Sequence, residues 1–455
     1  MQQLHPALAL FQRSTMSLLI GIALTGTAQA QSLIEIYDMA KGYDAAFQSA
    51  KSQYQANLAK AEQGKANLLP TANLSGSATR SSLESTTNPA TTTTDRSYTT
   101  QTAGVSLNQP LYRPANLANY RQSQKALDSA QATLIQAEQD LIVRTSQAYF
   151  DVLGSQDSLT FVKAQKTAVA EQLAAAKRNF EVGTSTITDT REAQARYDLV
   201  LAQEIAADND LRVKKLALEL LVGKTGLSPF NIKKQSVLPP VPEGSMETWV
   251  SNSEQLHPGI QQARTNLEVA KLETEKAEAG HKPTVDFTLG YNVQRNLNGT
   301  AVTTFSGVNS NQINVASAGI NANLPLFAGF ATQNRIKETV ALEDKARTDL
   351  EGVQRQVAQA TRTAYLGLQS GLGQVNALTA AEASSQSALD ANQLGYKVGV
   401  RINIDVLNSQ SQLYQTKRDL AKARYDVLVG QLKLRQANGS LKAEDLQAVN
   451  ALLAK

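Results

Sequence analysis

Residues 180–198 read FEVGTSTITDTREAQARYD, and residues 395–414 read GYKVGVRINIDVLNSQSQLY. Both stretches have an aromatic residue shortly before a Val-Gly pair and an aspartate six residues after the glycine. The two glycines, Gly183 and Gly399, lie 216 positions apart. A period this long indicates a duplicated structural unit rather than a short solenoid repeat.

The duplication extends beyond these two stretches. The offset stays at 216 through the second half of each copy, so this part contains no gap. The recurring segments are Ala148-Tyr149 with Ala364-Tyr365, Gly223 with Gly439, and Gln109-Pro110-Leu111-Tyr112 with Leu324-Pro325-Leu326-Phe327.

Proline is absent from residues 115–228 and 326–455, although the chain has 12 prolines. Because proline costs a helix interior about 3 kcal/mol, both stretches are free to form long helices. Mostly apolar residues recur there every seven positions, which is typical of helices that supercoil left-handedly. The first copy has Tyr120, Leu127, Leu134, Leu141 and Ala148, then Val152, Leu159, Lys166, Leu173 and Phe180 after a four-residue shift; the second has Leu368, Val375, Glu382, Leu389 and Tyr396.

Each long helix is expected to run for about 65 residues, or roughly 100 Å. Gly183 and Gly399 would then form sharp turns, because glycine adopts a positive φ without steric cost. Shorter helices are expected to return to about Lys224 and Asn438. The result is two helical hairpins far longer than a globular domain needs.

Strands are expected in the Ser-, Thr- and Asn-rich stretches. Apolar and polar residues alternate over residues 285–294, and more weakly over 72–79. The partner strands are expected at 97–112 and 311–327, with polar loops at 85–96 and 298–310. This alternation is typical of transmembrane barrels, and also of half-buried soluble sheets. Four strands cannot close a barrel, and lipid does not tolerate open sheet edges, so the pattern predicts an oligomer.

The N-terminus has the pattern of a secretory signal peptide. Arg13 precedes the apolar run 16–24, and small residues follow at Ala28 and Ala30, which predicts a signal peptide over 1–30. The alternative is a membrane anchor, but this run is far shorter than the ~20 residues a spanning helix needs. Export favours the membrane interpretation of the strands.

Composition argues against several classes of function. The formal charge is only +4 and 5% of residues are aromatic, so no basic and aromatic surface for nucleic acid is indicated. There is no cysteine, and no histidine spacing indicates a metal site. Gly223-Lys224-Thr225 lacks the earlier glycine of a phosphate-binding loop, since Leu218 stands there. We therefore expect no catalytic residues, no cofactor, and a protein that is not an enzyme.

The chain resembles the TolC family of outer-membrane factors from about Gln31 to Leu441. The resemblance rests on the order and duplication of SLIEIYDMAKGYDAAF at 32–47, Leu69-Pro70, Lys282-Pro283, LNQPLY at 107–112, NLPLF at 323–327, and the two stretches quoted first. One departure is the helix start at His257-Pro258, where the family often has Asn-Pro. The first repeat has Tyr43-Asp44 there and no proline, and Asp44 is expected to cap the helix instead.

The resemblance implies an all-α fold with membrane β, in which a long α-helical coiled-coil barrel joins a transmembrane β-barrel formed jointly by three chains. The implied domains are repeat 1 over 31–225, an equatorial linker over 226–247, repeat 2 over 248–439 and a C-terminal equatorial segment over 440–455. Each repeat would hold a helix, two barrel strands and a long helical hairpin.

The resemblance also implies roles for residues near the turns. Links that close the periplasmic end match Gln172, Thr188, Asp189, Tyr396, Arg401 and Arg424. Asp405 matches a ring of acids at the entrance, whereas Asn408 stands where a second acid is expected, which predicts three entrance carboxylates rather than six. The tips that dock an adaptor match Val182, Gly183, Val398 and Gly399.

The predicted function is a homotrimeric channel-tunnel in the bacterial outer membrane that extends into the periplasm. It would provide the exit duct for a tripartite efflux pump or a type I secretion system. Its expected partners are outer-membrane lipid, a periplasmic adaptor (membrane fusion) protein and an inner-membrane pump or ABC exporter, with no nucleic acid. The alternative is an exported coiled-coil structural or adhesive protein without a pore. The cargo, whether drugs, metal ions or a polypeptide, stays open.

Overall fold

The computed structural model describes residues 31–87, 92–233, 238–240, 243–297 and 310–454. The predicted signal peptide 1–30, parts of both predicted strand loops and parts of the predicted linker lie outside these residues. The chain divides into two compact units, which are described separately. Unit 1 comprises the chain up to Gln48, Ala137–His257 and the chain from Ala358 onward; unit 2 comprises Ser49–Gln136 and Pro258–Val357.

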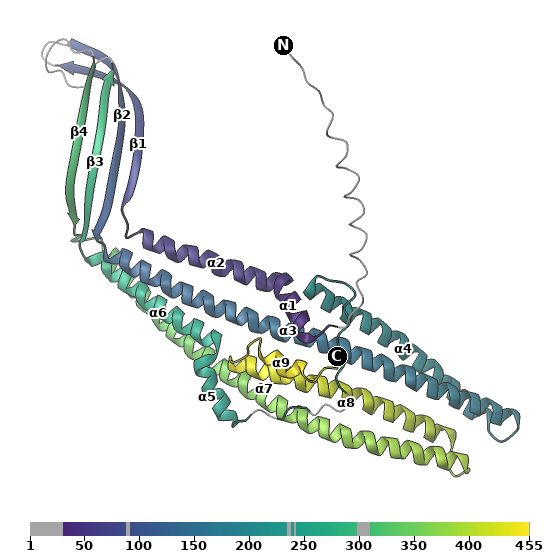
Figure 1. Ribbon diagram of the computed structural model, residues 1–455. Coiled ribbons are helices and arrows are strands. Elements are labelled where there is room, and N and C mark those ends of the chain that lie inside the picture. The colour runs from purple at the N-terminus through teal and green to yellow at the C-terminus, as the bar shows by residue number, and fades with distance from the viewer. Residues whose placement is uncertain (1–30, 88–91, 234–237, 241–242, 298–309, 455) are drawn as a thin grey trace, which may run out of the picture. The chain divides into compact units, whose positions relative to one another are not determined.

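The described elements follow the duplicated order predicted from the sequence (Figure 1). The first copy has α1 (Leu33–Tyr43), α2 (Ala45–Ala66), β1 (Thr71–Thr87), β2 (Thr92–Tyr112), α3 (Pro114–Glu181) and α4 (Ile187–Val222). The second has α5 (Met246–Leu256), α6 (Pro258–Glu278), the 3-10 turn η1 (Ala279–His281), β3 (Thr284–Leu297), β4 (Ser310–Asn323), α7 (Ala331–Lys397), α8 (Asn403–Asn438) and α9 (Asp445–Asn450).

Unit 2 contains an antiparallel sheet with the strand order β1-β2-β3-β4. The register places Leu74, Val105, Tyr291 and Ala316 in one row across the four strands. Side chains alternate between the two faces of a strand, so this row and its neighbours at every second position form an apolar face. Strands β1 and β4 are the two edges of the described sheet.

Two strand boundaries differ from the prediction. Strand β1 continues to Thr87 and β2 begins at Thr92, inside the stretch expected to be a polar loop. Threonine is polar but β-branched, and it fits a pleated strand well. Strand β4 ends at Asn323 instead of continuing to 327. Pro325 follows, and its missing N–H group cannot donate to a neighbouring strand.

The long helices form two hairpins, α3 with α4 and α7 with α8, whose turns lie in unit 1, although the first parts of α3 and α7 belong to unit 2. Helices α3 and α7 have 68 and 67 residues, close to the expected length. The seven-residue pattern is confirmed in the middle of these helices, where most of its apolar members are buried, whereas Leu127 and Leu134 are half-buried and Phe180 at the end of α3 is 44% exposed. The buried members include Leu141, Val152, Leu159, Leu173, Leu368, Val375 and Leu389. Leu407 of α8 packs into the cluster formed by α3 and α4, which joins the two hairpins. Each such buried side chain contributes about 1.5–3 kcal/mol.

Three distant segments of unit 1 meet around Tyr149. Its hydroxyl donates to the backbone oxygen of Gln31 at 3.2 Å and to that of Phe230 at 3.1 Å. Backbone bridges join Gln31 with Pro229, and Ile232 with Leu453. The start of the described chain, the segment after α4 and the C-terminal segment are therefore held together.

Asp44 caps α2, as expected from the sequence. Its Oδ1 accepts from the backbone N–H of Phe47 at 2.8 Å. The Arg144 guanidinium also donates to both carboxylate oxygens, at 2.9 and 3.0 Å. The Asp44 side chain is 7% exposed, so this pair is shielded on the acid's side. The hydrogen bonds from Arg144 lower the pKa of the Asp44 carboxyl, although burial opposes this.

None of the helices in the described ranges combines the length and apolar character needed to cross a membrane.

Candidate gate at the helical turns

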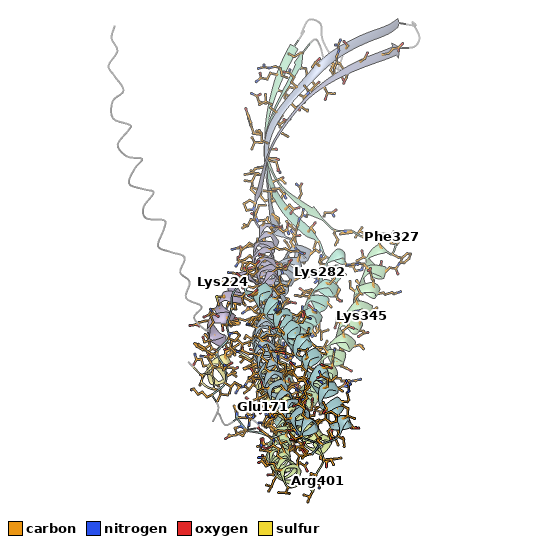
Figure 2. The ribbon with its side chains drawn as sticks, turned by 90° about the vertical axis from the view of Figure 1, so that its right-hand side faces the viewer. Glu171, Lys224, Lys282, Phe327, Lys345 and Arg401 are labelled. Atoms are coloured by element: carbon orange, nitrogen blue, oxygen red, sulfur yellow. The ribbon has the colours of Figure 1, made fainter. Side chains whose placement is uncertain are left out.

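The two turns of unit 1 have the backbone geometry predicted for them. Gly183 has φ 75° and Gly399 has φ 81°, both in the left-handed region that favours glycine. Each turn carries an apolar residue that points into solvent, since Val182 is 72% exposed and Val398 is 65% exposed. Arg401 lies at the second turn, between α7 and α8 (Figure 2).

At the first turn, Asp189 closes the start of α4. Its Oδ2 accepts from the Ser185 hydroxyl at 2.7 Å, the Thr186 hydroxyl at 2.7 Å and the Thr186 backbone N–H at 3.0 Å. The Thr186 hydroxyl oxygen in turn accepts from the Asp189 backbone N–H, which completes a capping box. Burial raises the pKa of Asp189, but these hydrogen bonds outweigh it and hold the pKa below its ordinary value. The Asp189 carboxylate therefore has a structural role within the chain.

At the second turn, α8 begins without a side-chain cap, and the equivalent carboxylate, that of Asp405, is not part of a capping box. Ile402 is the N-cap of α8, and its side chain makes no cap hydrogen bond. Asp405 instead lies 3.7 Å from the Arg401 guanidinium, and this ion pair is largely open to solvent. The two aspartates hold equivalent places in the repeat, yet only Asp189 takes part in a capping box, while Asp405 pairs with Arg401.

Asn403 connects the two hairpins close to the turns. Its side chain is fully buried; it accepts from the Gln172 amide at 2.5 Å and donates to the Asp189 backbone oxygen at 3.2 Å. Beside it, the Tyr396 hydroxyl accepts from the Asn179 amide at 3.3 Å. Three of the six expected link residues thus lie in contacts between the hairpins. Asn403 and Asn179 were missed because neither is charged and neither repeats in the other copy.

The remaining expected link residues are not joined to these contacts. Thr188 and Arg424 are exposed, and within the described ranges neither forms a side-chain hydrogen bond or an ion pair. Arg401 pairs with Asp405, four residues further along. Among the described residues of one copy, no guanidinium forms an ion pair with Asp189.

Asn408, which stands where a second entrance acid was expected, has a cationic partner. Its Oδ1 accepts from the Arg196 guanidinium at 2.6 Å, which joins α8 to α4. Arg196 is not among the site residues predicted from the sequence. The interaction depends on the rotational setting of two helices, which the sequence pattern does not specify.

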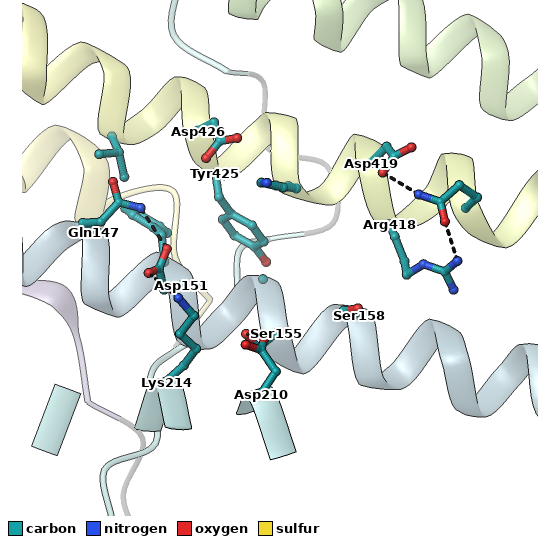
Figure 3. A pocket seen from close by; sticks show the side chains of 15 residues that line it. Gln147, Asp151, Ser155, Ser158, Asp210, Lys214, Arg418, Asp419, Tyr425 and Asp426 are labelled. Carbon is teal, nitrogen blue, oxygen red and sulfur yellow. Dashed lines mark hydrogen bonds and ion pairs between the residues drawn. The ribbon is translucent and has the colours of Figure 1, made fainter. Parts of the chain in front are cut away.

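A cavity of about 550 Å³ lies further along unit 1 between α3, α4 and α8 (Figure 3). Tyr425 extends from α8 toward α3, and its hydroxyl donates to the Asp157 carboxylate at 2.6 Å. Burial raises the pKa of Asp157, and the hydrogen bond from Tyr425 opposes this rise. Across the cavity, Asp151 pairs with Lys214 at 3.2 Å, and Ser155 donates to Asp210 at 2.7 Å. The Tyr425–Asp157 contact joins the two hairpins, whereas the other two contacts fasten α3 to α4 within the first hairpin.

Nothing in the described ranges gathers three or more His, Asp or Glu side chains that could hold a metal ion. The polar groups at the turns bond mainly with one another, and the apolar tips face solvent. This arrangement suits helix ends that can move apart and back together, with apolar tips that can bind a partner protein.

Comparisons with known proteins match this chain over almost its whole length. The family described as outer membrane efflux protein matches residues 36–224 and 249–440. The outer membrane protein TolC of Vibrio cholerae is 32% identical over 430 residues, which cover 94% of this chain and 95% of that protein. The proteases secretion protein PrtF of Dickeya chrysanthemi is 28% identical over 451 residues, covering 97% and 95%. The solved outer membrane channel CmeC of Campylobacter jejuni is similar in fold, with a TM-score of 0.75, 16% identity and 95% coverage of both chains.

Proposed function

This chain belongs to the outer membrane efflux protein family, and we propose that three copies form a duct that a periplasmic adaptor and an inner-membrane pump or ABC exporter open. Membership confirms the predicted fold class, the outer-membrane location and the function as an exit duct for efflux and secretion. The alternative, a poreless structural or adhesive protein, is not favoured. The chain acts as a conduit without chemistry, so its energy must come from a partner.

The open sheet is the observation that supports assembly from several copies. Its edge strands β1 and β4 leave backbone N–H and C=O groups unpaired, and lipid does not tolerate such edges. Three copies supply twelve strands, enough to close one barrel. Tyr149 and the segments around it would form the belt of the tunnel.

The closed state of the duct is proposed to depend on links near the turns. Gln172, Asp189 and Tyr396 hold the hairpins together within one copy. Arg401, Arg424 and Thr188 are exposed and so remain available to another copy. A guanidinium fork that reaches a carboxylate of a neighbouring copy would hold the coil closed, yet it would release when a partner competes. The exposed tips at Val182 and Val398 are proposed to dock the adaptor.

Single-channel conductance in planar bilayers tests the duct and its gate. Wild-type protein is expected to show a small, steady conductance, and Arg401→Ser a clearly larger one. Arg212→Ser is the matched control, because Arg212 also forms an exposed i,i+4 ion pair, with Asp208. Equal conductance in all three proteins would remove the gate assignment and leave the duct. Folded, membrane-inserted protein without pores would refute the duct itself.

Asp405 is proposed to form an entrance ring of three carboxylates, one from each copy. Three charges attract a multivalent cation less strongly than six, so block by a trivalent cation from the entrance side is expected to be weak. Conductance titrated with such a cation, in wild type and in Asp405→Asn, measures this. Tight block that survives Asp405→Asn would contradict the proposal.

A further inference from the structure

A groove of about 410 Å³ lies between α4 and α8, and Gln165 of α3 also lines it. Two of its described lining residues carry a charge, and both are arginines, Arg196 and Arg418. The other lining residues of the described chain are amides, serine and aliphatic side chains. The groove therefore concentrates positive charge in neutral, polar surroundings.

Among the described residues, Arg418 has only neutral hydrogen-bond acceptors. Its guanidinium donates to Gln165 Oε1 at 3.1 Å and to Gln415 Oε1 at 2.7 Å. The neighbouring Asp419 carboxylate accepts from the Gln415 amide at 2.9 Å rather than from the guanidinium (Figure 3). Burial lowers the pKa of Arg418, although the charge of Asp419 opposes this. An arginine stays charged in proteins. Within the described ranges this half-buried cation therefore has neutral acceptors and no direct anionic partner.

Arg196, like Arg418, donates to a neutral acceptor in the described chain. Its guanidinium donates to the neutral Asn408 Oδ1 at 2.6 Å. Glu204, two turns further along α4, lies 2.5 Å from Lys166, so its charge is already paired. Gln203 also lines the groove, and its Oε1 is buried without a hydrogen-bond partner. Rotating this amide presents its N–H groups instead, which adds donors for an acceptor-rich ligand.

We propose that this groove binds a small soluble oxyanion, of the carboxylate, sulfate or phosphate class, between Arg196 and Arg418. Guanidinium forks match the two oxygens of such groups. The groove's volume is on the scale of small-molecule sites, which favours a free ligand over a macromolecule. An anion there would also join α4 to α8, close to the contacts of the proposed gate. Anion binding in this groove does not depend on whether the protein forms a conducting duct.

Binding is tested on the purified full-length protein with sodium sulfate as the probe. The melting temperature is followed by circular dichroism against sodium chloride of equal ionic strength. A bound ligand stabilises by an amount that follows its occupancy, so wild type is expected to show a sulfate-specific rise. In Arg196→Gln and in Arg418→Gln the apparent dissociation constant is expected to rise about tenfold each. Arg212→Gln, on the exposed side of α4 and outside the groove, is expected to bind as wild type does.

Two further measurements keep the test decisive if an arginine variant folds poorly. Asn408→Asp places a carboxylate beside Arg196 and is expected to compete with sulfate, which also weakens binding about tenfold. In crystals soaked with selenate, anomalous density is expected within hydrogen-bond distance of both guanidinium groups. The proposal is overturned if wild type shows no sulfate-specific rise, if the three groove variants respond as wild type does, or if selenate leaves the groove empty.

Discussion

Arg401 and Ile402 occupy, at the second turn, the places that Ser185 and Thr186 hold at the first. The first pair supplies hydroxyls that bind the Asp189 carboxylate. The second pair supplies none, so α8 begins without a side-chain cap. Two differences between the copies thus make the Asp189 carboxylate part of a helix cap and leave the Asp405 carboxylate outside any cap.

Removing the cap at the first turn is expected to loosen the start of α4. Thr186→Ala should cost about 1 kcal/mol locally and speed amide hydrogen exchange in the first turn of that helix. Conversely, Ile402→Thr should slow exchange at the start of α8. Thr188→Ala is the control, since Thr188 is exposed and its hydroxyl makes no hydrogen bond among the described residues. Unchanged exchange in Thr186→Ala would show that the turn is held by other contacts.

Asp44 gives a pH-dependent prediction. Its folded pKa is lowered, so its contribution to stability is fully present above its ordinary pKa and is lost as the pH falls through the lowered value. Asp44→Asn is expected to lower stability by about 2 kcal/mol at neutral pH, and by progressively less as the pH falls from about 4 toward the lowered pKa. Thermal melts at neutral pH and across this acidic range measure this. Glu268→Gln, which breaks an exposed ion pair with Lys271, should change little at either pH.

At the scale of the element, the helices were the most predictable part. Proline positions and the seven-residue pattern specified both long helices, and the lengths agree within a few residues. The strand ends were less predictable, because the polar threonines of β1 and β2 were taken for a loop. Contacts such as Asn403 with Gln172 were not predictable, since they depend on how two hairpins are rotated against each other.

The segments around Tyr149 give a prediction at this scale. Tyr149→Phe keeps the ring but leaves the backbone oxygens of Gln31 and Phe230 without this donor. The free energy of unfolding is expected to fall by about 1–3 kcal/mol, and hydrogen exchange should rise in both segments. Tyr54→Phe is the control, since Tyr54 on α2 is half-buried and makes no hydrogen bond in the described chain. Equal exchange in both variants would show that the backbone bridges alone hold the segments.

At the scale of the whole molecule, one face of α4 is not covered by any other part of the described chain. Ile205, Leu216 and Leu220 are 67%, 64% and 77% exposed. Large apolar side chains repeated on one helix indicate an interface, and the proposed trimer provides it. In the double variant Leu216→Glu, Leu220→Glu, assembly is expected to fail, as measured by chemical crosslinking in detergent. The reversed-charge control Lys215→Glu should still crosslink as trimers; trimers from the double variant would place the interface elsewhere.

The two unpaired edges of the sheet also have a consequence for biogenesis. A lone copy meets the bilayer with backbone groups that nothing satisfies, while in water the same edges invite pairing with any other strand. If the proposed trimer closes the barrel, insertion and assembly are expected to be coupled, because only the assembled sheet has no open edge. A periplasmic protein that covers β1 and β4 beforehand is then expected to reduce aggregation.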